Sequence, residues 1–399
     1  MKALSQFFVL LLFIIGITGC GGSDSASKAE PIYDKPAVAA ETVPSGQMGG
    51  SIQNTPLPDN LNTTTVTILA GGAITPGTTR TAGFLNYTGT KAQFNRPISI
   101  TTNKLAIYAA DYNNHVIRKI SLPDLKVETF AGSGVAGFAD GVETAARFYY
   151  PSAITMDSTN LYVTDSRNFA VRKIDLATRT VTTIAGSSEA AGSIDSTVGT
   201  DARFNELHGI TTDGNNIFVS DSNNTIRWIV KNPDETYKVT TLAGTPDKVG
   251  SADGTAEKAR FNLPGQLTTD GTYLYVTDFN NHTVRRINIL TAAVDTIAGT
   301  KGVSGASDIA PGTFYQPNGI TTDGTYLYVT DSYRNTIRRM NKNGENITTL
   351  AGSITGIAGL TTNTAGTAAL FDTPIGLTTD GISLFVADSR NNIIRRIEP

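Results

Sequence analysis

Cysteine and histidine are scarce in this chain. One Cys and three His occur among 399 residues. A single thiol excludes an intrachain disulfide, and a chain of this length can bury enough surface to be stable without one. The sequence has no HxH or HExxH pair, nucleophile elbow, phosphate-binding loop or dinucleotide fingerprint. Motifs therefore identify no catalytic constellation and no local metal cluster.

Positive charge and long apolar runs are scarce as well. The net charge is −3 and 17% of the residues are charged, so there is no basic surplus to bind nucleic acid. The apolar run from Phe7 to Ile17 is too short for a stable membrane span. We therefore expect no nucleic-acid partner, and we do not interpret this run as a transmembrane helix.

Repetition, by contrast, dominates the sequence. The stretch LYVTDFNNHTVRRI, Leu274 to Ile287, has six related copies, and the aspartates that close the first strand of each copy follow at intervals of 53 to 57 residues. A regular period of this length indicates a repeat architecture. The repeated aspartates are Asp111, Asp165, Asp221, Asp278, Asp331 and Asp388.

Each copy predicts four short strands. In the fifth copy these are residues 319–322, 327–331, 336–340 and 345–351, and the turn signals Asp323-Gly324 and Asn343-Gly344 precede the second and the fourth. Four short antiparallel strands in every ~40–50 residues are typical of a β-propeller blade. The sequence therefore predicts an all-β fold, a six-bladed β-propeller.

The pairing of the second and third strands can also be predicted. If a four-residue turn follows Asp278, then Asp278 pairs with Thr283 and Val276 with Arg285. Because side chains alternate between the two faces of a strand, neither face of this sheet is purely polar. Such a sheet is expected to lie between two neighbouring sheets.

The two ends of the repeat region are predicted to close the ring. The sixth copy stops before its fourth strand, and a fourth-strand sequence, Val66 to Gly71, stands ahead of the first copy. We predict that this segment forms the outer strand of the last blade, where it would shield an exposed sheet edge.

The repeat resembles the NHL-repeat family. The segments Tyr328 to Asp331 and Pro317 to Ile320 are similar to the family's repeat core, and so is the pattern A-G-x-x-G…D-G…A-R-F between Gly244 and Phe261. The resemblance covers nearly everything after residue 62. It implies a propeller that binds proteins, RNA or small ligands. A few family members are enzymes, among them a metal-dependent lyase that uses His in its channel.

Two copies depart from the pattern. The third has Leu207 where the others have Pro, and it is one residue short between Asp221 and Arg227. In the fifth copy Asn335 stands one place late, behind Arg334.

The N-terminal residues are predicted to lie outside the propeller. Residues 1–19 have the features of a signal peptide, and the sequence leading to Cys20 resembles the bacterial lipoprotein signal, whose Cys is acylated. The alternative is an ordinary secretory signal with a chance Cys. By the same resemblance, Gly21 after Cys20 implies the outer membrane rather than the inner one. Residues 20–62, rich in small and polar residues, are predicted to be a lipid-anchored flexible linker, and residues 63–399 the propeller.

One rim of the predicted propeller gathers the turns between second and third strands and the long connections into each first strand. By analogy, propellers commonly bind ligands there. The repeated aspartates lie at these turns, where a ring of carboxylates could hold a cation. We favour a structural interpretation, in which each Asp bonds backbone N–H groups of its turn and pairs with the Arg seven residues on. The recurring basic pairs, such as Arg285-Arg286, are also interpreted as structural.

Residues that differ between copies are the candidates for binding. His208 breaks its own repeat, and departures from a repeat are where function is expected. His115 and His282 occupy equivalent turns of the first and fourth blades. A rim His can equally be a simple turn residue.

Basic and aromatic side chains are further rim candidates. Arginines precede the repeated Phe in three consecutive connections, where they could bind an anionic ligand or pair with the nearby Asp-Gly loops. These are Arg147, Arg203 and Arg260. Aromatic residues that vary between blades could form a binding patch; they are Tyr149, Tyr150, Phe279, Tyr315 and Tyr333.

Our leading functional hypothesis is an envelope-anchored lipoprotein whose propeller is a binding scaffold for an unknown protein or small molecule, without a cofactor and without catalysis. The alternative is a metal-dependent lyase or lactonase with Ca²⁺ or Zn²⁺ at the channel mouth, for which the sequence names no metal ligands. A third hypothesis is a purely structural envelope protein.

Overall fold

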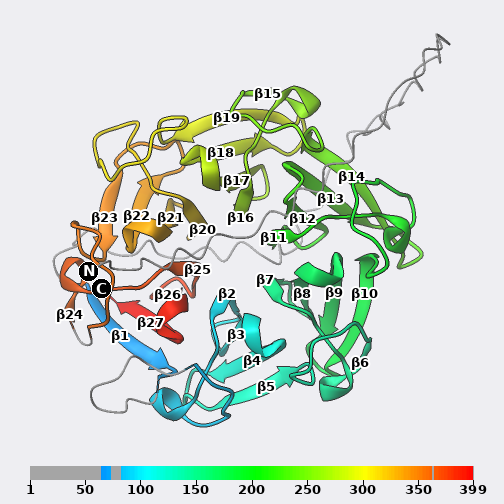
Figure 1. Cartoon of the computed structure of the whole chain (residues 1–399), viewed down its shortest axis with the longest axis horizontal. Coiled ribbons are helices and arrows are strands. Elements are labelled where there is room, and N and C mark those ends of the chain that lie inside the picture. Colours follow the sequence, from blue (N-terminus) through cyan, green and yellow to red (C-terminus); the bar gives the residue numbers. More distant parts are fainter. Residues whose placement is uncertain (1–63, 73–81, 362–363, 399) are drawn as a thin grey trace, which may run out of the picture. The chain divides into compact units, whose positions relative to one another are not determined.

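The computed structural model describes residues 64–72, 82–361 and 364–398; the predicted signal peptide and linker lie outside this range. The described residues form six antiparallel sheets of four or five strands, arranged around a central axis as the blades of a β-propeller (Figure 1). Within this range the helical turns are short 3-10 turns, and there is no α-helix. The predicted all-β, six-bladed propeller is confirmed.

Each blade places its first strand nearest the central axis, and its second, third and fourth strands follow outward (Figure 1). The strands of blade 1 are β2 (Pro97–Thr102), β3 (Ala106–Asp111), β4 (Val116–Ser121) and β5 (Val127–Ala131). Those of blade 2 are β7 (Pro151–Met156), β8 (Asn160–Asp165), β9 (Ala170–Asp175) and β10 (Thr180–Gly186). Those of blade 3 are β11 (Leu207–Thr212), β12 (Asn216–Asp221), β13 (Thr225–Lys231) and β14 (Tyr237–Gly244).

Blades 4 to 6 follow the same plan. The strands of blade 4 are β16 (Pro264–Thr269), β17 (Tyr273–Asp278), β18 (Thr283–Asn288) and β19 (Ala293–Ala298). Those of blade 5 are β20 (Pro317–Thr322), β21 (Tyr326–Asp331), β22 (Thr336–Asn341) and β23 (Thr348–Ala351). Those of blade 6 are β25 (Pro374–Thr379), β26 (Leu384–Asp388), β27 (Ile393–Glu398) and β1 (Thr65–Ala70).

Three blades carry an additional two-residue strand outside the fourth. β6 (Gly141–Val142) pairs with β10, β15 (Gly254–Thr255) with β19, and β24 (Thr364–Ala365) with β1. These short pairings cover part of the outer edge of blades 2, 4 and 6.

The pairing predicted from the turn length is confirmed. Asp278 pairs with Thr283 and Val276 with Arg285. The strands of the fifth copy also occur where expected, except that β23 begins at Thr348 rather than at residue 345. The difference arises because the backbone of Asn341 bonds back to Glu345, which extends the preceding turn.

Ring closure also follows the prediction. In β1, Val66 pairs with Ile397 and Ile68 with Arg395 of β27, so the first described strand completes the last blade. Figure 1 shows β1 beside β27 although they come from opposite ends of the described chain.

The core lies between neighbouring blades rather than within one of them. Leu69 and Phe385 of blade 6 pack with Ile107 and Ile120 of blade 1 in one buried cluster. Phe218 of blade 3 likewise packs with residues of blade 4. Both faces of a sheet are therefore buried, as the mixed side-chain pattern of the strands indicates.

The innermost strand of blade 5 approaches that of blade 6 so closely that Gly319 leaves no room for a side chain. A Cβ on Gly319 would come within 1.9 Å of the carbonyl oxygen of Ile375 in the next blade. Blade 4 has a long side chain, Gln266, at the corresponding position. Its Nε2 donates to the carbonyl of Ile98 in blade 1 at 3.2 Å, and so links two opposite blades across the axis.

Candidate functional site

The turns after the second strands and the connections into the first strands meet on one rim. In blade 4, Asp278 ends β17 and its Oδ1 accepts a hydrogen bond from the backbone N–H of Asn262 in the connection, at 2.8 Å. The donors therefore come mainly from 16 residues earlier in the chain and not, as the sequence suggested, from the turn. In the other blades the same N–H belongs to Asn95, Tyr149, Asn205, Tyr315 and Asp372.

A fully buried arginine holds this carboxylate from the third strand. Nη1 of Arg285 donates to Asp278 Oδ2 at 2.6 Å and to the carbonyl of Arg260 at 2.9 Å. Nη2 donates to Asp253 Oδ1 and to the carbonyl of Ala252, each at 2.9 Å. We call this arrangement the arginine clamp, because one guanidinium joins the second strand, the third strand and the connection.

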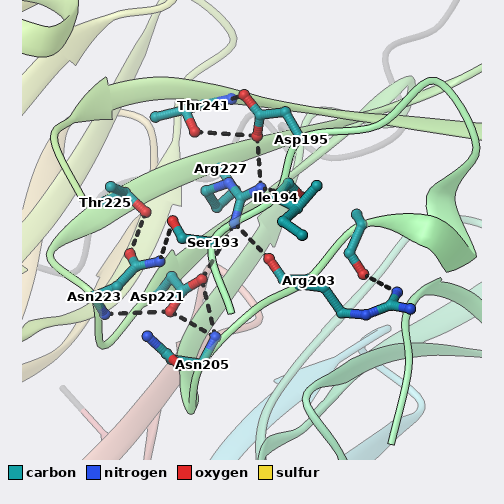
Figure 2. Close-up of polar contacts among 11 residues, drawn as sticks. Ser193, Ile194, Asp195, Arg203, Asn205, Asp221, Asn223, Thr225, Arg227 and Thr241 are labelled. Carbon is teal, nitrogen blue, oxygen red and sulfur yellow. Dashed lines mark hydrogen bonds and ion pairs between the residues drawn. The ribbon is translucent and has the colours of Figure 1, made fainter. Parts of the chain in front are cut away.

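The arginine clamp is present in every blade. Figure 2 shows it in blade 3, where Arg227 lies between Asp221 and Asp195. Each guanidinium also stacks on the repeated Phe, at 5.0 Å for Arg285 over Phe261. Among the described residues the Nε of each clamp arginine has no hydrogen-bond partner. The clamp arginines are Arg118, Arg172, Arg227, Arg285, Arg338 and Arg395.

Two irregular repeats change the electrostatics of their clamps. Burial raises the pKa of Asp221 and of Asp331 to about 7, whereas burial raises the pKa of Asp111, Asp165 and Asp388 to about 6. Each carboxylate of the second group, Asp111, Asp165 and Asp388, accepts an additional hydrogen bond from the side-chain amide of the Asn three residues on, which favours its charged form. The third repeat has lost a residue from this turn, and the fifth has Arg334 there.

Every repeated aspartate is thus buried and receives donors from the fold itself. This geometry favours the structural interpretation of the six carboxylates over a ring that holds a cation.

We predict that Arg285→Met destabilises the propeller much more than Arg286→Met, its neighbour in sequence. The first change leaves the Asp278 carboxylate buried without its cation, which lowers the free energy of unfolding by about 3–5 kcal/mol. Arg286 pairs with Asp295 near the surface, where a pair contributes about 0–1 kcal/mol. Chemical denaturation of both variants measures the difference, and equal losses would contradict the role of the clamp.

A second bond joins the turn to the next blade at five of the six junctions. His115 and His282 have left-handed backbones at the ends of turns η3 (Tyr112–Asn114) and η8 (Phe279–Asn281). Their Nδ1 atoms accept backbone N–H groups of Tyr150 at 3.2 Å and of Gln316 at 3.1 Å. Three other blades do the same with an amide oxygen, from Asn224, Asn335 and Asn392.

The junction between blades 2 and 3 is the exception. The equivalent residue there is Phe169, which has no acceptor atom, and Glu206 lacks the positive φ found at this position in the other five connections. An ion pair between Arg167 and Glu206, at 2.8 Å, joins these blades instead. The third repeat departs from the pattern at the next residue as well, where Leu207 replaces Pro.

His208 lies beside that irregular junction. It is partly buried in the first strand of blade 3 and has a hydrogen bond to the backbone of Pro264 in blade 4. Burial lowers its pKa, while the nearby Glu206 carboxylate opposes the shift. The structure therefore places His208 in a contact between two blades.

We predict that replacing His115 and His282 by Asn reduces the loss of stability in acid. Burial lowers the pKa of both histidines below the value of about 6.5 in an unfolded chain. Their contribution is then present above pH 6.5 and is lost as the pH falls, because a protonated Nδ1 cannot accept a hydrogen bond. The measurement is the free energy of unfolding between pH 7.5 and 5.

The clamp carboxyls have raised pKa values in the folded protein. Their contribution to the free energy of unfolding therefore increases as the pH falls from 7.5 to 5, which is opposite to the effect of the histidines. Only the difference between the wild type and the double Asn variant reports on the two histidines. Asn performs the same function in three other blades, so the variant is expected to be as stable as the wild type at pH 7.5. Parallel pH profiles would contradict the prediction.

The three predicted arginines lie in separate connections. Arg147 is exposed, and Arg203 and Arg260 are partly buried. Nη1 of Arg203 donates to the carbonyls of Thr200 and Ala202, and Arg260 donates in the same way to its own connection. Two of the three guanidinium groups are thus engaged in local contacts, which favours the structural alternative for them.

The structure brings some of the predicted aromatic residues together on the rim at blades 1 and 2. The rings of Tyr149 and Tyr150 stack at 5.0 Å, and Tyr150 stacks on Tyr112 at 4.6 Å. His115 contacts both Tyr149 and Tyr150 edge-on. Arg96 lies over Tyr112 at 5.4 Å. Sequence analysis missed Tyr112, although it occupies the position of Phe279 in the fourth copy.

A related cluster lies at blades 4 and 5. The ring of Tyr315 is 5.8 Å from His282 and 5.3 Å from Tyr333, and Phe279 is 6.3 Å from Tyr333. Tyr149 and Tyr315 are each 39% exposed and Tyr333 is 53% exposed. These rings are available to a ligand on the same rim as the turns.

Within residues 64–72, 82–361 and 364–398, no group of three His, Cys, Asp or Glu side chains could hold a metal ion. No helix in the same ranges is long and apolar enough to cross a bilayer. Cys20 lies outside them, so its acylation stays a prediction.

Known proteins support the repeat assignment. The human protein NHL repeat-containing protein 2 is 27% identical over 335 residues, which cover 74% of this chain and 44% of that protein. The Arabidopsis thaliana chloroplastic protein SUPPRESSOR OF QUENCHING 1 is 25% identical over 77% of this chain and 30% of its own. No family model matches. The chain spans less than half the length of the curated relatives it matches.

Solved structures support the fold. A Bacteroides thetaiotaomicron protein of unknown function aligns with a TM-score of 0.63 and 17% identity over 84% of this chain and 76% of its own. A protein of the same organism described as an auxiliary nutrient binding protein aligns with a TM-score of 0.61 and 15% identity, with the same coverage. At these identities the similarity is one of fold.

Proposed function

We propose that this six-bladed β-propeller, which has NHL repeat-containing homologues, is an exported lipoprotein that binds a protein or small-molecule ligand on its aromatic rim. The observation that carries the binding proposal is the exposure of Tyr149, Tyr315 and Tyr333. Exposed aromatic side chains combine a large apolar surface with a polar group, and are enriched where proteins bind partners.

The fold itself does not require these tyrosines. At the position of Tyr149 and Tyr315 the clamp uses only the backbone N–H, and four other blades have Asn or Asp there. A side chain that is free to vary among repeats can be selected for a ligand instead. The exposed rings therefore represent a property of particular blades rather than of the propeller.

The proposed anchor rests on the sequence. An apolar run from Phe7 to Ile17 is followed by Cys20, which is the single cysteine of the chain. Acyl chains contribute about 0.8 kcal/mol for each buried CH₂ group, so two or more of them hold a protein firmly in a bilayer. We propose that residues 20–62 tether the propeller to the envelope, in the outer membrane rather than the inner one.

We favour binding over the metal-dependent lyase because the three histidines already have partners in the fold. His115 and His282 accept backbone N–H groups through Nδ1, and His208 has a hydrogen bond to the backbone of Pro264. The solved propellers named for nutrient binding share the fold, and their name agrees with a binding role for this chain.

We predict that a photo-crosslinking residue placed at Tyr149 or Tyr333 in the full chain forms a specific adduct in intact cells. The same residue at Tyr87 is the matched control, because this tyrosine is 52% exposed but its carbonyl accepts the N–H of Val127 in β5, the fourth strand of blade 1, and it belongs to neither aromatic cluster. Adducts are detected on gels and identified by mass spectrometry. Equal labelling at all three positions, or none, would contradict a rim ligand.

The same cells test the anchor. The wild type is expected to incorporate labelled palmitate and to sediment with membranes, whereas Cys20→Ser is expected to lose both properties. A wild-type chain that takes up no label would contradict the lipoprotein assignment and leave the rim proposal standing.

A further inference from the structure

We propose that the rim carries two matched half-sites that together bind a neutral, hydroxyl-rich polymer, a polysaccharide chain, across the mouth of the propeller. This inference rests on the proposed binding function and names the class of its ligand. Half-site 1 consists of Tyr112, Asn113, His115 and Tyr149; half-site 2 consists of Phe279, Asn280, His282 and Tyr315.

The pair of His and Tyr rings has the same geometry in the two half-sites. The His115 and Tyr149 rings are 5.7 Å apart with an interplanar angle of 75°, and the His282 and Tyr315 rings are 5.8 Å apart at 75°. Each is built from the turn of one blade and the connection into the next, at blades 1 and 2 and at blades 4 and 5. They are three blades apart and therefore on opposite sides of the central axis (Figure 1).

Planar amides accompany the rings in both places. The side chain of Asn113 donates to Asn95 Oδ1 at 3.0 Å, and Asn280 donates to Asn262 Oδ1 at 3.2 Å. Side-chain amides both donate and accept hydrogen bonds, as hydroxyl groups do. A sugar ring presents apolar C–H groups on its face and hydroxyl groups at its edge, so tyrosine rings beside amides match both parts of its surface.

Charge favours a neutral ligand. The Asp165 and Asp331 carboxylates, which contact the backbones of Tyr149 and Tyr315, are fully buried. The two histidines accept N–H groups through Nδ1 and are therefore neutral in this arrangement. The charged groups near half-site 1 are Arg96, which lies over Tyr112, and Arg167 and Glu206, which pair with each other. The half-sites thus offer rings and amides rather than an array of like charges.

The duplication favours a polymer over a single sugar. One exposed ring with a few amides binds weakly, but two sites that engage one chain gain affinity through a high effective concentration. A ligand with repeating units can place the same chemical group in both half-sites. We therefore expect long chains to bind more tightly than the monosaccharide from which they are built.

The test is affinity electrophoresis of the detergent-solubilised full chain through gels that contain laminarin, xylan or dextran. We expect at least one polysaccharide to retard the wild type, with an excess of its monosaccharide having little effect. Tyr149→Ala and Tyr315→Ala should each weaken binding about tenfold or more, and the double variant should not be retarded. Tyr149→Phe keeps the ring and Tyr87→Ala leaves both half-sites intact, so both should bind like the wild type.

Thermal unfolding of each variant confirms that the propeller is folded, because the clamp uses only the backbone at these positions. The inference is overturned if none of the three polysaccharides retards the wild type, or if the double variant is retarded equally. Rim crosslinks to an envelope protein without retardation would overturn it and leave the proposed binding function standing. If there are neither rim crosslinks nor retardation, the polysaccharide inference and the proposed binding function are both contradicted.

Discussion

The buried pair of arginine and aspartate is the interaction on which the rest of this structure depends. Moving two charges out of water is unfavourable, and in the interior it is offset only by close geometry and additional hydrogen bonds. Arg285 meets that condition with two carboxylates and two carbonyl groups. Asp253 extends the network to the outer strand through Thr296. One residue type thus fixes the position of a long connection that has little regular structure of its own.

That constraint separates the residues that build the propeller from those that are available for function. The clamp takes the side chains of the turn aspartate and the third-strand arginine, but only the backbone of the residue after the repeated Phe. Tyr149 and Tyr315 occupy this last position, so their rings are exposed and take no part in the clamp. His115 and His282 combine both roles, because each accepts a backbone N–H group of the next blade and its ring also contacts an exposed tyrosine.

Much of this could be predicted from the sequence, because period and turn length determine which residues pair. The strand register around Asp278 and the closure by Val66 both follow from that logic. Contacts between blades could not be predicted in the same way. The acceptor role of His115 depends on where the next connection passes, and the contact of Gln266 with Ile98 depends on the width of the ring. Departures from the repeat gave a partial signal, since the altered third copy marks the junction where the pair of Arg167 with Glu206 stands in place of the usual acceptor at the end of the turn.

Hydrogen–deuterium exchange of the connection amides tests the central claim most directly. The N–H groups of Asn95, Tyr149, Asn262 and Tyr315 lie in loops, yet each donates to a buried clamp carboxylate. The account predicts that they exchange as slowly as amides of the central strands, because both are released only when the blade opens. Exchange as fast as in exposed loops would show that the carboxylates do not hold the connections, and would contradict the account.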